Sequence, residues 1–180
     1  MNVGYAISDF VLALACAVIA VRAAKTRPGV ALACAAIGVA AIFGVLRFSG
    51  TAGVEGAHRF LSMLGGAAAL PLLAASLAWP ESLAASTVRG AALTLLVAAA
   101  IGVAVTVGAG FVLWGQAVPA LSAVAILIAT LPKHAVRKSF GAVVLVLTFG
   151  LVAARQTLAG FEPLEVLHYG MTTALLLLCL

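Results

Sequence analysis

Charged residues are scarce in this 180-residue chain, and their scarcity excludes most soluble folds. Asp, Glu, Lys and Arg together make up 8% of the residues, whereas 65% are hydrophobic, and the mean hydropathy is +1.27. A soluble domain carries about a quarter charged residues, and its helices have polar faces. Hydrocarbon is therefore the solvent for most of this chain, which predicts a multi-pass integral membrane protein.

Cysteine is also rare, and Cys16, Cys34 and Cys179 each lie inside an apolar run. A thiol in such a run behaves as a small hydrophobe. The sequence contains neither a disulfide framework nor a paired C-x-x-C metal motif. The stretch before Cys16 faintly resembles a lipoprotein cleavage site, but Asp9 stands where a basic region is needed, so we expect a retained helix.

Seven apolar stretches, separated by turn and charge signals, predict seven transmembrane helices. Each has about 17 to 22 residues, enough to cross a hydrocarbon core of about 30 Å at 1.5 Å per residue. Alternation of period two is absent, so only helices can satisfy the backbone in lipid. We expect an all-α bundle, one domain over 1–180, in which small residues let helices approach closely. The expected spans are 5–22, 29–47, 58–79, 89–108, 111–131, 138–154 and 163–180.

The division between the fourth and fifth spans rests on length. The stretch 90–131 is almost uncharged, and a single helix of that length would extend about 60 Å, twice the hydrocarbon core. We therefore place a turn at Gly108-Ala109-Gly110. A re-entrant hairpin at this turn would leave six spans, which is the alternative.

Basic residues are distributed unevenly between the two predicted membrane faces. The loops after the first, third and fifth spans carry seven Lys or Arg, and the opposite face carries three. Because cytoplasmic loops are enriched in these residues, we expect the N-terminus outside, the C-terminus in the cytoplasm, and a location in a bacterial inner membrane. The net charge of +5 is then a topology signal, and we infer no nucleic-acid role. The seven are Arg22, Lys25, Arg27, Arg89, Lys133, Arg137 and Lys138; the three are Arg47, Arg59 and Arg155.

Four ionisable residues, Asp9, His58, Glu165 and His168, lie just inside predicted helix ends on the outer face. An ionisable residue within a span costs about 2.5–3.5 kcal/mol on insertion scales, so it usually faces the bundle interior with a partner. Glu165 and His168 are three residues apart and share a helix face, as in metal sites of helical bundles. With His58 and Asp9 they would complete a nitrogen and oxygen ligand set for zinc.

A zinc ion held in this way would lower the pKa of its bound water from 15.7 toward about 7 and so activate it for hydrolysis. Glu165 and Asp9 are the candidate catalytic residues, and Glu162 is an alternative base. Structural roles are the competing interpretation: Glu162 as a helix-end residue, Glu55 in an ion pair with Arg59, Asp9 paired with Arg47 or capping a helix, and His58 as a hydrogen-bonded structural residue.

An acid in the first helix, a histidine in the third and a histidine at the start of the last of seven resemble the membrane hydrolases related to alkaline ceramidases and the progestin and adiponectin receptors. That resemblance implies a zinc-bound water that cleaves an amide or ester bond in a lipid. Two motifs of that family depart here, because Val54 replaces the serine four residues before His58 and Leu164 replaces the histidine four residues before His168. The likeness is architectural.

Three functions are compatible with these residues. The first is a metal-dependent lipid hydrolase that uses all four, and the second is a carrier in which Asp9, Glu165 and His168 form an outward-facing proton or cation site. The third is an accessory subunit whose polar cluster locks the first, third and seventh helices together. The expected partners are the lipid bilayer, a lipid or small-molecule substrate, and a second membrane protein or another copy of the chain. The absence of an arginine ladder, a selectivity-filter loop and a nucleotide-binding loop disfavours voltage-gated channels and ATP-driven pumps.

Overall fold

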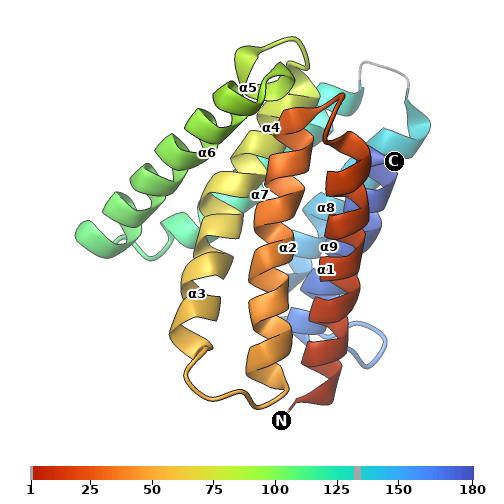
Figure 1. Cartoon of the computed structure of the whole chain (residues 1–180). Helices are drawn as coiled ribbons and strands as arrows, with labels where there is room; N and C mark the ends of the chain where they lie inside the picture. The colour runs from red at the N-terminus through yellow and green to blue at the C-terminus, as the bar shows by residue number, and fades with distance from the viewer. Residues whose placement is uncertain (1, 132–134) are drawn as a thin grey trace.

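The computed structural model describes residues 2–131 and 135–180, and Lys133, one of the residues that predict the topology, lies outside these ranges. The described residues form helices and no strand, apart from one isolated bridge between Leu158 and Phe161. The predicted all-α fold is confirmed (Figure 1). In chain order the elements are α1 (Val3–Ala23), α2 (Pro28–Phe48), α3 (Glu55–Leu64), η1 (Gly65–Ala69), α4 (Leu70–Ala78), α5 (Leu83–Ser86), α6 (Val88–Val103), η2 (Ala104–Gly108), α7 (Trp114–Thr130), α8 (Val136–Ala153) and α9 (Pro163–Cys179).

Five helical stretches within the described residues are long and apolar enough to cross a membrane, while α7 and α9 are apolar but shorter. This pattern is compatible with an integral membrane protein. The count of seven spans and the orientation of the termini stay predictions. The five stretches are Val3–Ala23, Pro28–Phe48, Glu55–Ala78, Val88–Gly108 and Val136–Ala153.

Helix α1 packs along α2 on one side and α9 on the other (Figure 1). The close approach depends on small residues, because a Cβ placed on Gly38 of α2 would lie only 3.1 Å from the Cβ of Cys16 in α1. Ile19 and Leu175 are fully buried in this region. In lipid, helices associate through such van der Waals contact rather than through release of water.

The third long helix is interrupted near its middle. Residues Gly65–Ala69 form η1, a π-helical segment that joins α3 to α4. Such segments insert an extra residue into an α-helix and occur frequently at functional sites. Gly66 in η1 lies directly against α7, because a Cβ placed on it would be 2.8 Å from Pro119 Cγ.

Helix α6 stands apart from the bundle and slants away from it (Figure 1). Only Ala91 and Gly102 of its described residues are buried. A Cβ placed on Gly102 would lie 3.0 Å from the Cβ of Ala67, so α6 touches the bundle at η1, and it also contacts α2. The turn that follows η2 brings α7 back beside Gly66, because Gly66 also faces the carbonyl oxygen of Gly115. Helix α7 therefore begins beside the middle of the third long helix rather than beside its end.

Candidate functional site

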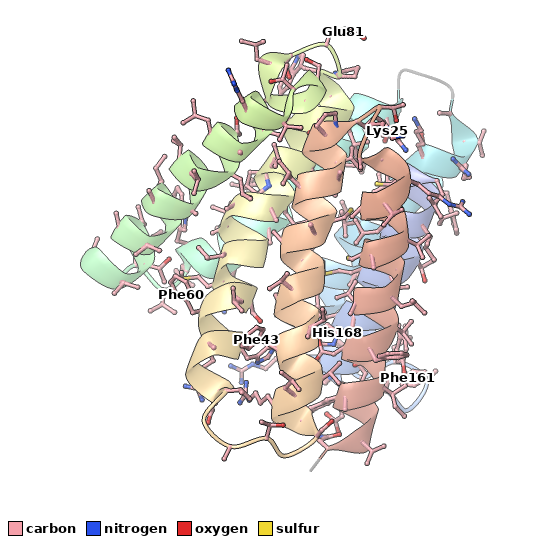
Figure 2. The ribbon with its side chains drawn as sticks, in the orientation of Figure 1. Lys25, Phe43, Phe60, Glu81, Phe161 and His168 are labelled. Carbon is pink, nitrogen blue, oxygen red and sulfur yellow. The ribbon has the colours of Figure 1, made fainter. Side chains whose placement is uncertain are left out.

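Asp9 and His168 form a buried polar pair between α1 and α9. Asp9 is 1% exposed and His168 is 7% exposed, and His168 Nδ1 lies 3.5 Å from Asp9 Oδ1. The same nitrogen is 3.0 Å from Ser8 Oγ. Figure 2 shows His168 away from the end of the bundle that carries Lys25 and Glu81. The structure thus brings together two of the four predicted site residues.

The hydrogen bonds around Ser8 favour one tautomer of His168. When the Ser8 hydroxyl donates its single hydrogen to the Tyr5 carbonyl oxygen, 3.0 Å away, it accepts from the His168 Nδ1–H. In this arrangement neutral His168 carries its proton on Nδ1, and Nε2 retains its lone pair. His168 can accept a proton, a hydrogen bond or a metal ion through Nε2.

Gly44 on α2 makes room for the Asp9 carboxylate. A Cβ placed on Gly44 would lie 2.2 Å from Asp9 Oδ2 and 2.5 Å from its Cγ, so any side chain at this position would displace the carboxylate. Asp9 Oδ2 is buried and has no hydrogen-bond partner among the residues that the structure describes. A buried unpaired carboxylate oxygen is costly, so this atom calls for a proton, a water or a ligand.

His58 belongs to a separate, partly exposed cluster on α2 and α3. Arg47 Nη1 donates to His58 Nδ1 at 3.1 Å, and Arg47 Nη2 donates to Glu55 Oε1 at 3.0 Å. Arg59 pairs with the same Glu55 oxygen at 2.6 Å, which confirms the predicted ion pair. Because Nδ1 of His58 accepts a hydrogen bond, the neutral ring carries its proton on Nε2. His58 therefore offers a metal ion no free lone pair in this tautomer, because Nδ1 accepts from Arg47 and Nε2 carries the proton.

Glu165 serves the start of its own helix. Its Oε2 accepts from the backbone N–H of Glu162 at 2.8 Å, and the Glu162 side chain accepts from the backbone of Glu165 in return. This reciprocal pair is a capping box, which satisfies two N–H groups at the helix end. The predicted helix-end role of Glu162 is confirmed. Glu165 also lies against α1, because its Oε1 occupies the space that a side chain on Gly4 would need.

A cavity of about 170 Å³ adjoins the Asp9–His168 pair in the middle of the bundle. Since a water occupies about 30 Å³ in the liquid, the cavity can hold a small polar group with a few waters. Its wall is built by α1, α2, α7, α8, α9 and the interrupted third helix. The lining residues are Asp9, Leu12, Ile37, Ala40, Ala41, Ser62, Gly65, Gly66, Leu70, Gly115, Pro119, Phe149, Leu167, His168 and Met171.

The predicted four-residue site is therefore divided. Asp9 and His168 meet at the cavity. The His58 side chain instead hydrogen-bonds to Arg47, and the Glu165 side chain to the backbone of Glu162. Helix α2 lies between α1 and α3, so the first, third and seventh predicted helices are not all direct neighbours (Figure 1). Within residues 2–131 and 135–180 no group of three or more His, Cys, Asp or Glu is arranged to hold a metal ion. Zinc binding stays a prediction.

Two residues at the Asp9–His168 pair were not among the predicted ligands: Ser8 and Gly44. Arg47 near the end of an otherwise apolar helix, with Gly44 one turn before it, was the available signal that α2 contributes. Ser8 had the weaker signal of standing beside Asp9. No family model, curated protein or solved structure matches the chain, so the family resemblance also stays a prediction.

Proposed function

We propose that the chain is a proton-coupled membrane carrier of a small molecule, in which Asp9 and His168 bind the proton. One observation carries the proposal: the buried Asp9–His168 pair borders an internal cavity. Carboxylates and imidazoles inside membrane proteins commonly form proton relays and substrate pathways. Asp9 Oδ2 is a buried acceptor in that relay without a partner among the described residues.

The walls of the cavity supply the flexibility that a carrier needs. Gly65 and Gly66 belong to the π-helical segment, and Pro119 lies inside α7, where it cannot donate the usual backbone hydrogen bond. All three residues line the cavity. Carriers commonly bind their substrates beside helices that are interrupted in mid-membrane, because the two halves of such helices can move separately.

Proton flux in proteoliposomes tests the proposal. Vesicles that contain a pH-sensitive dye would be challenged with fractionated pools of cell metabolites, and at least one pool should drive proton influx through the wild-type protein. Asp9→Asn and His168→Gln should abolish this influx. His58→Gln removes a buried imidazole outside the pair and is the matched control, which should retain it. Wild-type influx in His168→Gln would refute the proton-binding role.

A metal-dependent hydrolase is the second candidate, and the tautomer of His168 favours it. Histidines that bind metals usually direct the opposite N–H at a carboxylate or another acceptor, as His168 Nδ1 does toward Ser8 and Asp9. Elemental analysis of purified protein separates the two candidates. About one zinc per chain in the wild type, lost in folded His168→Ala, would favour the hydrolase. Intact wild-type stability with neither zinc nor proton flux would favour the accessory subunit.

The proposed topology has seven spans, with the N-terminus outside. The uneven distribution of Lys and Arg supports it. A reporter fused before Met1 should label from the extracytoplasmic side, and one fused after Leu180 from the cytoplasm. Both ends on one side would instead indicate six spans, with the turn before α7 re-entering the membrane.

A further inference from the structure

A second cavity of about 310 Å³ adjoins the cavity that holds Asp9 and His168. It lies between the start of α7, the end of α8 and α9, and we call it the vestibule. Four residues line both the vestibule and the cavity at the pair, so the two spaces meet at these residues. They are Gly115, Pro119, Phe149 and Leu167. Leu167 immediately precedes His168, so the lining of the vestibule reaches within one residue of the pair.

The boundary between the two spaces is open beside Gly115. This residue has no side chain, and a Cβ placed on it would meet no neighbouring atom within 4 Å. The far side of the vestibule is lined by Arg155, an exposed residue that directly follows α8. Phe161, between α8 and α9, lies at the end of the bundle opposite Lys25 (Figure 2). The vestibule therefore leads from this end of the bundle toward the pair.

Arg155, at the mouth of the vestibule, has no acidic partner. It forms no ion pair with any of the five Asp and Glu residues, all of which lie within the described ranges. Arg47 and Arg59, by contrast, both pair with Glu55. The backbone of Arg155 has a φ of 53°, in the left-handed region that favours glycine. An arginine stands here at a conformational cost, and its guanidinium is free to bind an anion from outside the protein.

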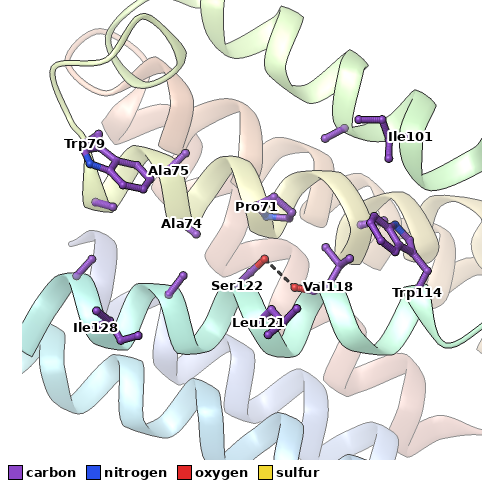
Figure 3. A pocket seen from close by; sticks show the side chains of 15 residues that line it. Pro71, Ala74, Ala75, Trp79, Ile101, Trp114, Val118, Leu121, Ser122 and Ile128 are labelled. Carbon is purple, nitrogen blue, oxygen red and sulfur yellow. Dashed lines mark hydrogen bonds between the residues drawn. The ribbon is translucent and has the colours of Figure 1, made fainter. Parts of the chain in front are cut away.

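Gln116 supplies a second polar side chain to the vestibule, and its amide makes no hydrogen bond with the residues that the structure describes. The larger apolar groove between α4, α6 and α7, about 770 Å³ in volume, is lined by no charged residue among those described (Figure 3). Its Ser122 hydroxyl is already used, because it donates to the Val118 carbonyl oxygen at 2.8 Å. The vestibule, and not this groove, combines an unpaired cation with an unpaired amide.

The chemistry and size of these spaces favour a small anion with one negative charge. A guanidinium binds a carboxylate through two parallel hydrogen bonds, and an amide N–H adds a third donor. The vestibule has one unpaired cation and mostly apolar walls, which match a single charge better than a dianion such as a phosphate ester. An apolar cavity of about 150 Å³ binds benzene, so the cavity at the pair, about 170 Å³, holds a solute of similar size.

We propose that the vestibule and the cavity at the pair bind a small monocarboxylate, which Arg155 and Gln116 receive at the mouth. This inference rests on the proposed function, since it names the class of solute that the carrier moves. A carboxylate that continues to the pair approaches Asp9, where two negative charges oppose each other unless the Asp9–His168 pair holds a proton. One anion and one proton then move together, with no net transfer of charge.

Equilibrium binding tests this site without any proton gradient. The probe is radiolabelled pyruvate, which has as many non-hydrogen atoms as benzene, added to the full-length protein in phosphatidylcholine nanodiscs. Arg155→Gln removes the charge and should weaken binding about tenfold. Gln116→Leu removes the amide and should weaken it about threefold. Arg59→Gln removes an exposed arginine that is already paired with Glu55, and this matched control should bind as the wild type does.

Gly115→Leu tests the path between the two spaces. The new side chain has room beside the helix, so the stability of the protein should be unchanged, but it would occupy the opening. Proton influx driven by pyruvate in proteoliposomes should fall about tenfold. Gly150→Leu is the matched control, because Gly150 has equally open surroundings on α8 and lines neither space. Equal influx in the two variants would contradict the path.

Four binding results would overturn the inference. They are the absence of saturable pyruvate binding to the wild type, equal binding by Arg155→Gln and Arg59→Gln, equal displacement of pyruvate by uncharged pyruvamide, and equal displacement by glycerol phosphate, which would make Arg155 a contact for lipid headgroups. The proposed function fails separately. If pyruvate binds as expected but no solute drives proton flux, the carboxylate site stands and the carrier does not. If other solutes drive flux that Arg155→Gln leaves unchanged, the carrier stands and the carboxylate does not.

Discussion

The two sides of this bundle are packed in opposite ways. In the most apolar 18-residue segment of α2, 50% of the residues are buried. In the corresponding segment of Val88–Gly108, which forms α6 and η2, 11% are buried. Helix α2 faces α1 with glycine, alanine and cysteine, whereas α6 directs Leu93, Leu96 and Val97 outward. Lipid tails are as apolar as leucine, so large side chains gain little by leaving lipid for protein. Small residues, rather than hydrophobic ones, decide where helices close together.

The polar pair and the apolar groove lie on different sides of the bundle for this reason. The tightly packed side encloses Asp9 and His168, where displacement of water strengthens the interaction of the pair. The loosely packed side leaves an apolar groove of about 770 Å³ between α4, α6 and α7. A substitution that enlarges a side chain should therefore be costly on the first side and tolerated on the second.

Gly44→Ala should give the largest effect. The new methyl group would lie 2.2 Å from Asp9 Oδ2 and force the carboxylate away from His168. We expect a loss of about 3 kcal/mol in the free energy of unfolding, at the upper end for overpacking. SDS titration in mixed micelles, followed by circular dichroism, measures it. Gly108→Ala is the control, because its Cβ would meet no described atom within 4 Å. Equal losses in both variants would refute the contrast.

Ile19→Ala should have an intermediate effect. Ile19 is fully buried where α1 meets its neighbours. We expect a loss of about 2 kcal/mol, the lower end of the range for soluble proteins, because a cavity forms but the removed carbons have no favourable transfer from water. Leu96→Ala on the exposed face of α6 is the matched control and should change stability by less than about 0.5 kcal/mol. A similar loss in Leu96→Ala would show that α6 is packed in the membrane.

Gly102→Ala should have the smallest effect, although its Cβ would lie 3.0 Å from Ala67. Only two residues of α6 are buried, so the helix can move outward by a few tenths of an ångström. Alanine is also about 0.8–1.0 kcal/mol better than glycine inside a helix, which offsets the contact. We expect a net change below about 0.5 kcal/mol in the same SDS titration. A loss as large as that of Gly44→Ala would mean that α6 is fixed to the bundle.

Local features of this chain could be predicted from its sequence. The first two expected spans, 5–22 and 29–47, agree closely with α1 and α2 because their ends carry basic residues and Pro28. The ion pair between Glu55 and Arg59 also follows from helical spacing alone. These features depend on residues within one or two helical turns of each other.

Features that depend on which helices meet could not be predicted. Nothing in the spacing of Asp9 and His58 indicates that α2 lies between their helices. The capping box occupies Glu165 although its spacing from His168 also suits a metal site. The cavity arises from six separate segments, so no periodicity along the chain reports it. Its sequence signals, the Gly65-Gly66 pair and Pro119, are equally common in ordinary membrane helices.

The π-helical segment Gly65–Ala69 has a consequence for how this chain can tolerate deletions. It sets the rotational phase between the half-helix that carries His58 and the half-helix that buries Leu72 and Leu73. Removal of one residue from the segment would restore a continuous α-helix and leave the two halves close to their present rotation, because the wide turn already absorbs one extra residue. Leu72 and Leu73 would stay in the interior, and the wide turn beside the cavity would be lost. The same deletion within the regular helix α2 would turn one half relative to the other by about 100°, so a deletion should be better tolerated in this segment than in α2.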